Sequence, residues 1–294
     1  MGQAKSNEVQ NPAELEKPWR DFNWAQKEEL KKRLTDFTLN DPNMKYIGIL
    51  VAGQIGAGKS SFINSVQNVF QGRITSSALA DSCSGSSHSF TKQYITHHIR
   101  NGSKGSLLPF VFRDIMGMEP EKLCGSSTED IVSAVFGHVK EQYKVDPQSP
   151  LTIESPDFNR DPNLSEMALC LVYILDADKV QLTDDRLIEK LQTVRQRISE
   201  KGIPQVIVMT KVDEACPLVK NDLRKIYSSK KIKDKMELCS AKVGVPLNHV
   251  FPVKNYSYEI DTKDDIDVLI LKALDQIVHL ANDRLEIIQG MDVQ

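Results

Sequence analysis

The sequence predicts an α/β fold, a three-layer sandwich in which helices cover both faces of a mainly parallel sheet, with further helices flanking it at the N- and C-termini. Apolar runs of strand length alternate along the chain with amphipathic segments of helix length. That alternation is typical of the crossover connections between parallel strands. The first apolar run also leads through a glycine-rich turn into a helix-like segment, and 294 residues are enough for one large domain.

The strands are expected where apolar side chains run together or alternate: residues 46–52, 90–99, 107–113, 169–175, 204–209 and 250–253. The helices are expected at residues 21–37, 59–70, 129–143, 183–201 and 265–288. The pattern is clearest over 183–201, because Leu187, Leu191 and Val194 share one helical face. Asp184 and Asp185 stand in the first turn of this segment, where the helix dipole favours acids.

These elements divide the chain into three parts. Residues 1–18 are polar and show no periodicity, which predicts a disordered tail. Residues 19–45 form an N-terminal helical segment in this interpretation, and residues 46–290 form the α/β domain. Two long connections are expected, a serine-rich one at 75–89 and one at 145–164 that contains four prolines.

Composition argues against several classes of protein. The net charge of −3 is nearly balanced, unlike that of a protein dedicated to nucleic acid. The longest apolar run has nine residues, 167–175, far short of the roughly 20 that span a bilayer. Five cysteines without a CxxC pair suggest neither a disulfide framework nor a zinc site, and no secretory signal opens the chain. A cytoplasmic location fits these features best.

A phosphate-binding loop follows the first strand. Residues 53–60, Gly-Gln-Ile-Gly-Ala-Gly-Lys-Ser, match G-x-x-x-x-G-K-[ST], with a strand before and a helix after. The glycines allow the backbone N–H groups to turn inward toward an anion, and the lysine places a positive charge beside the β- and γ-phosphates. The predicted phosphate cradle comprises Gly53, Gly56, Ala57, Gly58, Lys59, Ser60 and Ser61.

A second motif, Thr210-Lys211-Val212-Asp213, ends the strand over 204–209 and predicts guanine as the base. A carboxylate at Asp213 can accept hydrogen bonds from both N1–H and N2–H₂ of guanine, whereas adenine offers no such pair and would leave a buried carboxylate unpaired. The aliphatic stem of Lys211 can lie along the plane of the base.

The metal site is expected from three oxygen ligands for Mg²⁺. The Ser60 hydroxyl is one, and Asp114 of the D-x-x-G motif would hold the ion through water. Gly117 of the same motif would meet the γ-phosphate through its N–H, so that hydrolysis releases this loop. Thr91 is the expected third ligand, with Ser87 as the alternative in the serine-rich loop.

Two segments compete for the last contact to guanine. Ser240-Ala-Lys242 matches a sequence common in small GTPases, but it follows a charged, helix-like stretch. Lys254 and Asn255 follow the strand-like residues 250–253 instead, so we expect these two residues to meet the base. With the other motifs they predict a P-loop NTPase of the G-domain type that binds GTP or GDP with Mg²⁺.

The catalytic group is not assigned. Met118, directly after D-x-x-G, cannot orient water by hydrogen bonding, and Ile55 stands where rapidly regulated GTPases have glycine. Both predict slow hydrolysis unless a partner or a second copy supplies the missing group. Three polar residues could substitute for it, Gln54, His88 and Glu119, and none of them is assigned this role. The alternatives are a scaffold that never hydrolyses its nucleotide and an ATPase that uses Asp176 as a Walker B carboxylate.

With these motifs in hand, the chain resembles the interferon-induced protein 44 family from about residue 46 to 288. The most distinctive segments are Val253-Lys-Asn-Tyr256 and Leu269-Ile-Leu-Lys-Ala-Leu274, and an apolar residue after D-x-x-G also fits the family. The resemblance implies a cytoplasmic, interferon-responsive protein linked to antiviral defence. Longer members carry an additional N-terminal domain, for which this chain is too short.

The N-terminal residues Met1-Gly2-Gln-Ala-Lys-Ser6 match the N-myristoylation pattern M-G-x-x-x-[ST]. A single acyl chain beside only one lysine gives marginal, reversible membrane attachment. Besides guanine nucleotide, the expected partners are other proteins and, in a nucleotide-dependent dimer, a second copy.

Overall fold

One six-stranded sheet forms the centre of the molecule in the computed structural model, which describes residues 13–76, 78, 92–102, 105–121 and 124–292. The strand order is β2-β3-β1-β4-β5-β6, and only β2 runs antiparallel to its neighbour. The strands are β1 (Ile47–Gly53), β2 (Ile95–Arg100), β3 (Leu107–Asp114), β4 (Ala168–Asp176), β5 (Gln205–Thr210) and β6 (Val250–Pro252).

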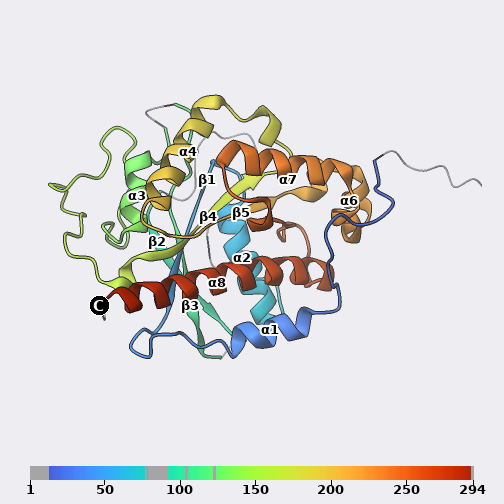
Figure 1. The fold of residues 1–294 in the computed structure, drawn as a ribbon, viewed down its shortest axis with the longest axis horizontal. Helices are drawn as coiled ribbons and strands as arrows, with labels where there is room; N and C mark the ends of the chain where they lie inside the picture. The colour runs from blue at the N-terminus through green and yellow to red at the C-terminus, as the bar shows by residue number, and fades with distance from the viewer. Residues whose placement is uncertain (1–12, 77, 79–91, 103–104, 122–123, 293–294) are drawn as a thin grey trace, which may run out of the picture.

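Helices cover both faces of this sheet (Figure 1). On one face lie α2 (Lys59–Gln71) and α8 (Asp264–Asp292), with α1 (Lys27–Thr35) packed against α8. On the other lie α3 (Thr128–Val135), α4 (Asp185–Ser199) and α7 (Lys230–Val243). Every residue of β1 and β4 is buried, as expected for parallel strands covered on both sides. The predicted α/β three-layer fold is confirmed.

The register of the parallel strands brings their carboxyl ends to one edge of the sheet. Val51 of β1 pairs with Asp114 of β3, and Asp176 of β4 pairs with Thr210 of β5. In open α/β sheets this edge is where ligands bind. The motifs predicted to bind phosphate, metal and base therefore come together from four separate strands.

Two predicted helices are much shorter in the structure, and the one expected over 183–201 spans only Asp185–Ser199. The N-terminal helix begins at Lys27 rather than 21. Before it, the Phe22 ring packs against both Trp24 and Tyr227, with ring centroids 4.7 Å and 5.1 Å apart. The helix expected over 129–143 ends at Val135, since Gly137 adopts a left-handed φ of 77°. A Cβ at Gly137 would lie 2.9 Å from the Pro162 ring, so the chain turns closely there.

The strand expected over 90–99 is also shifted, and β2 starts at Ile95. Residues 90 and 91 lie outside the described part of the chain. Gln93 forms a bridge with Lys144, and Tyr94 exchanges backbone hydrogen bonds with residues 142 and 143. This stretch therefore pairs with the connection after α3 instead of with β3.

The predicted tail over 1–18 is ordered over its described part. The Leu15 N–H donates to the Ser228 carbonyl, Glu14 forms an ion pair with Lys225, and Lys230 N–H donates to the Ala13 carbonyl. A polar segment without periodicity is thus held by long-range backbone pairing, which a local pattern cannot reveal. Residues 1–12, including Gly2 of the myristoylation pattern, are outside the described residues.

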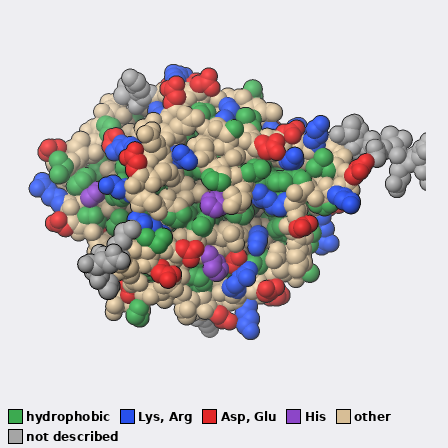
Figure 2. All heavy atoms as spheres, viewed as in Figure 1, with side chains coloured by type: hydrophobic (Ala, Val, Ile, Leu, Met, Phe, Trp, Pro, Cys, Tyr) green, Lys and Arg blue, Asp and Glu red, His purple; other side chains and the backbone are tan. Residues whose placement is uncertain are grey.

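The surface carries both signs of charge. On the face shown in Figure 2, acidic and basic side chains are interspersed rather than gathered into one basic stripe. Within the described residues, no helix combines the length and the apolar character needed to cross a bilayer.

We expect the contact between α1 and α8 to contribute measurably to stability. Arg33 makes a two-pronged contact with the buried Asp275, with Nε–Oδ1 2.8 Å and Nη2–Oδ2 3.1 Å. Arg33→Ala leaves that carboxylate poorly paired and should lower the free energy of unfolding by about 2 kcal/mol. Urea denaturation measures this loss. The control is Arg197→Ala, which removes an exposed pair with Glu129 and should cost less than about 1 kcal/mol. Equal losses would contradict the expectation.

Candidate functional site

The loop between β1 and α2 has the geometry of an anion cradle. Gly58 is the residue before the first turn of α2 and has a left-handed φ of 94°. A Cβ there would lie 3.0 Å from Asn255 Nδ2, so the loop and the segment after β6 are in close contact. A Cβ on Gly56 would meet no atom of the described residues within 4 Å, so none of them covers that part of the loop. The free N–H groups at the start of α2 add to the attraction for an anion.

Lys59 and Ser60 begin α2 and are both buried. The Lys59 ammonium folds over the loop and donates to the Gln54 carbonyl at 3.0 Å. The Ser60 hydroxyl donates to Asp114 Oδ2 at 2.6 Å. A hydroxyl and a carboxylate in contact form an all-oxygen donor set of the kind that suits Mg²⁺, so these two residues fit the predicted metal. Thr91, the third predicted ligand, lies outside the described residues, as do Ser87 and His88.

Thr210 has a structural contact that the sequence did not suggest. Its side chain is fully buried, and its hydroxyl donates to the Ala57 carbonyl at 2.6 Å. This bond ties the end of β5 to the phosphate loop. The sequence predicts that Thr210 contacts the nucleotide, and in the structure its hydroxyl supports the loop predicted to hold the phosphates.

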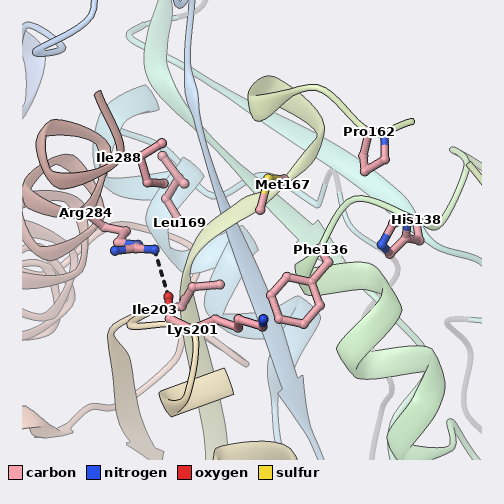
Figure 3. Close-up of a pocket in the computed structure, with 9 residues that line it drawn as sticks. All are labelled: Phe136, His138, Pro162, Met167, Leu169, Lys201, Ile203, Arg284 and Ile288. Atoms are coloured by element: carbon pink, nitrogen blue, oxygen red, sulfur yellow. Dashed lines mark hydrogen bonds between the residues drawn. The ribbon is translucent and has the colours of Figure 1, made fainter. Parts of the chain in front are cut away.

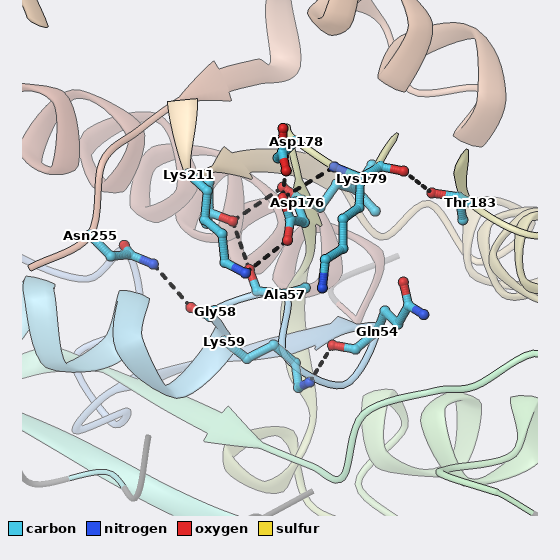
Figure 4. A network of polar contacts seen from close by, with 12 residues as sticks. Gln54, Ala57, Gly58, Lys59, Asp176, Asp178, Lys179, Thr183, Lys211 and Asn255 are labelled. Carbon is cyan, nitrogen blue, oxygen red and sulfur yellow. Dashed lines mark hydrogen bonds and ion pairs between the residues drawn. The ribbon is translucent and has the colours of Figure 1, made fainter. Parts of the chain in front are cut away.

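Lys211 is one of two described non-glycine residues with a left-handed backbone, at φ 56°. Its ammonium forms an ion pair with Asp176 Oδ2 at 2.8 Å, and both side chains are largely buried (Figure 4). Asp176 Oδ1 accepts from the backbone N–H groups of Asp178 and Lys179. Asp176 thus pairs with Lys211 and accepts from two backbone N–H groups of the turn that follows it, whereas Asp114 contacts Ser60. This division of roles disfavours the Walker B alternative.

Asp213 follows Lys211 at the base end of the site and lies 3.5 Å from the Lys254 ammonium. Lys254 also contacts Glu259 at 2.7 Å and stands over the Tyr258 ring at 4.7 Å. Burial alone would lower the pKa of Lys254, but its hydrogen bonds to Glu259 and Tyr258 and the charge of Asp213 raise it above its usual value. A permanent positive charge therefore stands beside the carboxylate predicted to recognise guanine. Glu259 and Tyr258 were not predicted from the sequence.

Asn255 and Tyr256 connect the same segment to α2 and α8. Asn255 Nδ2 donates to the Gly58 carbonyl at 3.1 Å, whereas its buried Oδ1 has no hydrogen-bond partner among the described residues. The Tyr256 N–H donates to Ser65 Oγ, and its hydroxyl donates to Asp267 Oδ1 at 2.6 Å. The Asn-Tyr pair thereby locks the segment after β6 against the phosphate loop.

The other candidate for the last contact to guanine, Ser240-Ala-Lys242, lies within a helix. Ser240 and Lys242 occupy the last turn of α7, where the Ser240 hydroxyl donates to the Val245 carbonyl.

Ser61 of the predicted phosphate cradle lies at the start of α2, where its carbonyl accepts from the Ser65 hydroxyl at 2.7 Å. The structure thus brings together the described members of the predicted site, at one edge of the sheet.

The D-x-x-G segment lies directly on the phosphate loop. A Cβ on Gly117 would come within 2.6 Å of the Ile55 nitrogen, and the Met118 N–H donates to the Gly53 carbonyl at 2.9 Å. The Met118 side chain is fully buried in the core, while Glu119, next along the chain, contacts Gln54. Burial raises the pKa of Glu119, against the effect of hydrogen bonds from Gln54 and the Ile55 N–H.

One hollow adjoins this edge of the sheet, and another lies toward the opposite edge. One, of 600 Å³, adjoins the base end of the site and is lined by Asp213, Lys254 and Tyr258 among others. The other, of 430 Å³, lies at the opposite end of β4 and β5, where apolar side chains such as Phe136 and Met167 form its walls and Lys201 and Arg284 border it (Figure 3). The second hollow lacks a phosphate loop and takes no part in the predicted site.

Curated proteins named interferon-induced protein 44 match most of the chain. The human protein is 33% identical over 243 residues, which cover 83% of this chain and 54% of that protein. The mouse protein is 31% identical over 257 residues, covering 87% and 60%. The chain belongs to the interferon-induced protein 44 family. It spans about half the length of these relatives.

The family membership predicted from the motifs is therefore confirmed. A human protein named interferon-induced protein 44-like is 29% identical over 240 residues, 82% of this chain and 52% of that protein. No model of a known protein family matches the chain.

Solved structures with similar folds have low sequence identity to the chain. Toc33 from Arabidopsis thaliana, in complex with GDP and Mg²⁺, is 15% identical at a TM-score of 0.49 and covers 88% of this chain and 93% of its own. A probable GTP-binding protein engB is 14% identical at a TM-score of 0.43, covering 80% and 99%.

The bond from Thr210 to Ala57 predicts a stability difference between two isosteric changes. Thr210→Val leaves the buried Ala57 carbonyl without that donor and should lower the free energy of unfolding by about 1–2 kcal/mol. Thr193→Val removes a hydroxyl on the exposed face of α4, where it donates to the Glu189 carbonyl, and should cost less than about 0.5 kcal/mol. Chemical denaturation compares the two, and an equal effect would refute the structural role of Thr210.

Proposed function

We propose that this chain is a GTP-binding switch protein that uses Mg²⁺ and hydrolyses GTP slowly. The observation that carries the proposal is the convergence, at one sheet edge, of the phosphate loop, the Ser60–Asp114 contact and Asp213. These are the three components that a guanosine triphosphate requires: an anion cradle, a metal site and a carboxylate for the base.

Each component has its own residues. Residues 53–61 would surround the phosphates, with the Lys59 charge beside the β- and γ-phosphates. Ser60 and Asp114, with Thr91, would hold Mg²⁺, which when bound neutralises charge on the phosphates. Gly117 would contact the γ-phosphate. Asp213 would accept from guanine, with Lys211, Lys254 and Asn255 around the base and Thr210 behind the loop.

The biological setting is proposed from the family. Relatives are named interferon-induced proteins, and we infer that this chain acts in the cytoplasm in an interferon-induced, antiviral response. Its mixed surface charge favours protein partners over nucleic acid. A nucleotide-dependent dimer and acylation at Gly2 belong to the same proposal.

Base selectivity tests the role of Asp213. Asp213→Asn should weaken GTP binding by about 100-fold and favour xanthosine triphosphate, because an amide can donate to the xanthine O2 that replaces the guanine amino group. Competition against a fluorescent nucleotide measures both affinities. Asp234→Asn, on the exposed side of α7, is the matched control and should bind like the unmodified chain. Preference for ATP, or an unchanged preference in Asp213→Asn, would refute the assignment.

Single-turnover hydrolysis separates a switch from a permanent scaffold. We expect phosphate release slower than about 10⁻³ per second, rising with protein concentration if a second copy supplies the missing group. Met118→Gln should not accelerate hydrolysis, since that side chain is buried, and should cost about 1–3 kcal/mol of stability by burying an amide. No phosphate release under any condition would favour the scaffold, and fast release from Met118→Gln would show that residue 118 can reach the nucleotide.

A further inference from the structure

Glu119 occupies a distinctive position beside the phosphate loop. Its Oε2 lies 3.5 Å from Gln54 Nε2, and the Ile55 backbone N–H is close enough to lower the pKa of the same carboxylate. The Lys59 charge acts favourably on the same carboxylate. The side chain is thus turned toward the loop rather than toward solvent, although it is only half buried.

The backbone that carries Glu119 is held firmly in this place. Met118 bridges to Gln54 in parallel register, and Gly117 lies against Ile55 with no room for a side chain. From the other side, the ammonium of Lys190 on α4 donates to the carbonyls of Glu119 and Glu121. The position of Glu119 is therefore set by contacts on two sides of its segment.

The groups that attract this carboxylate are the ones that a terminal phosphate would use. A phosphate loop binds anions through inward N–H groups, and its lysine serves the β- and γ-phosphates. Ile55 lies in the first half of the loop, away from the start of α2, and Lys59 reaches back to the Gln54 carbonyl beside it. A carboxylate and a γ-phosphate cannot both stay close to these groups without strong repulsion.

We propose, on the basis of the function proposed above, that the Glu119 carboxylate takes the place of the γ-phosphate at the Ile55 N–H and Lys59 when no triphosphate is bound. Entry of GTP then displaces Glu119, whereas GDP, which has no γ-phosphate, leaves it in place. Glu119 is thereby a specificity-determining residue that weakens triphosphate binding relative to diphosphate binding. Its displacement also moves the segment that Gly117 and Lys190 connect to the loop and to α4.

The affinities of two nucleotides test this role in the full chain stripped of nucleotide. Fluorescent GDP and a fluorescent non-hydrolysable GTP analogue are titrated with Mg²⁺ into the unmodified chain and into Glu119→Gln. The variant should bind the triphosphate analogue about tenfold more tightly and GDP less than about threefold more tightly. Glu121→Gln removes an equal charge from an exposed side chain two residues away and should change both affinities by less than about twofold.

A second measurement does not depend on nucleotide. Hydrogen exchange at the Ile55 amide of the stripped protein should be faster in Glu119→Gln than in the unmodified chain, and unchanged in Glu121→Gln. An equal change for both nucleotides, weaker binding of the triphosphate analogue, or identical Ile55 exchange in all three proteins would overturn the inference while leaving GTP binding intact. Failure of the unmodified chain to bind either nucleotide would overturn the proposed function together with it.

Discussion

A buried hydrogen bond from the Thr210 hydroxyl to the Ala57 carbonyl joins the two halves of the site. β1 delivers the phosphate loop and β5 delivers the motif for the base, and these strands are not neighbours, since β4 lies between them. The bond fixes how far the loop stands from Asp213. A second connection, from Asn255 to the Gly58 carbonyl, adds the segment after β6 to the same arrangement. The predicted nucleotide site depends on these contacts, because they hold the phosphate loop, the end of β5 and the segment after β6 together.

Much of the fold follows from local pattern. The strands at 47–53, 168–176 and 205–210 are continuous apolar runs, and their ends coincide with motif residues, so both could be located within a residue or two. The predicted boundaries fail where distant contacts decide them. Trp24 has near-helical spacing to the apolar residues that follow it but lies before the helix, packed on Phe22, which also contacts Tyr227. Residues 13–18 have no pattern of their own and are ordered by pairing with residues 225–230.

The candidate site likewise has features that local sequence pattern predicts and others that only distant contacts decide. The residues that come together at this edge of the sheet could be predicted, because the motifs for phosphate and base fix both residue type and spacing. The ion pairs that surround them could not. The ammonium of Lys211 pairs with Asp176, and Lys254 is held by Glu259, five residues away across a turn. Such pairings depend on side chains meeting in three dimensions, and many acids in the sequence would have been equally plausible partners.

The residue after D-x-x-G illustrates how backbone geometry changes the meaning of a motif. Because Met118 continues the pairing of β3 alongside the loop, successive side chains alternate between the core and the site. Met118 takes the inward position and is fully buried, so an apolar residue is what this backbone requires there. The alternation then turns Glu119 to the phosphate loop. The methionine that argues against a conventional water-positioning residue is thus the same feature that brings an acid to the Ile55 N–H.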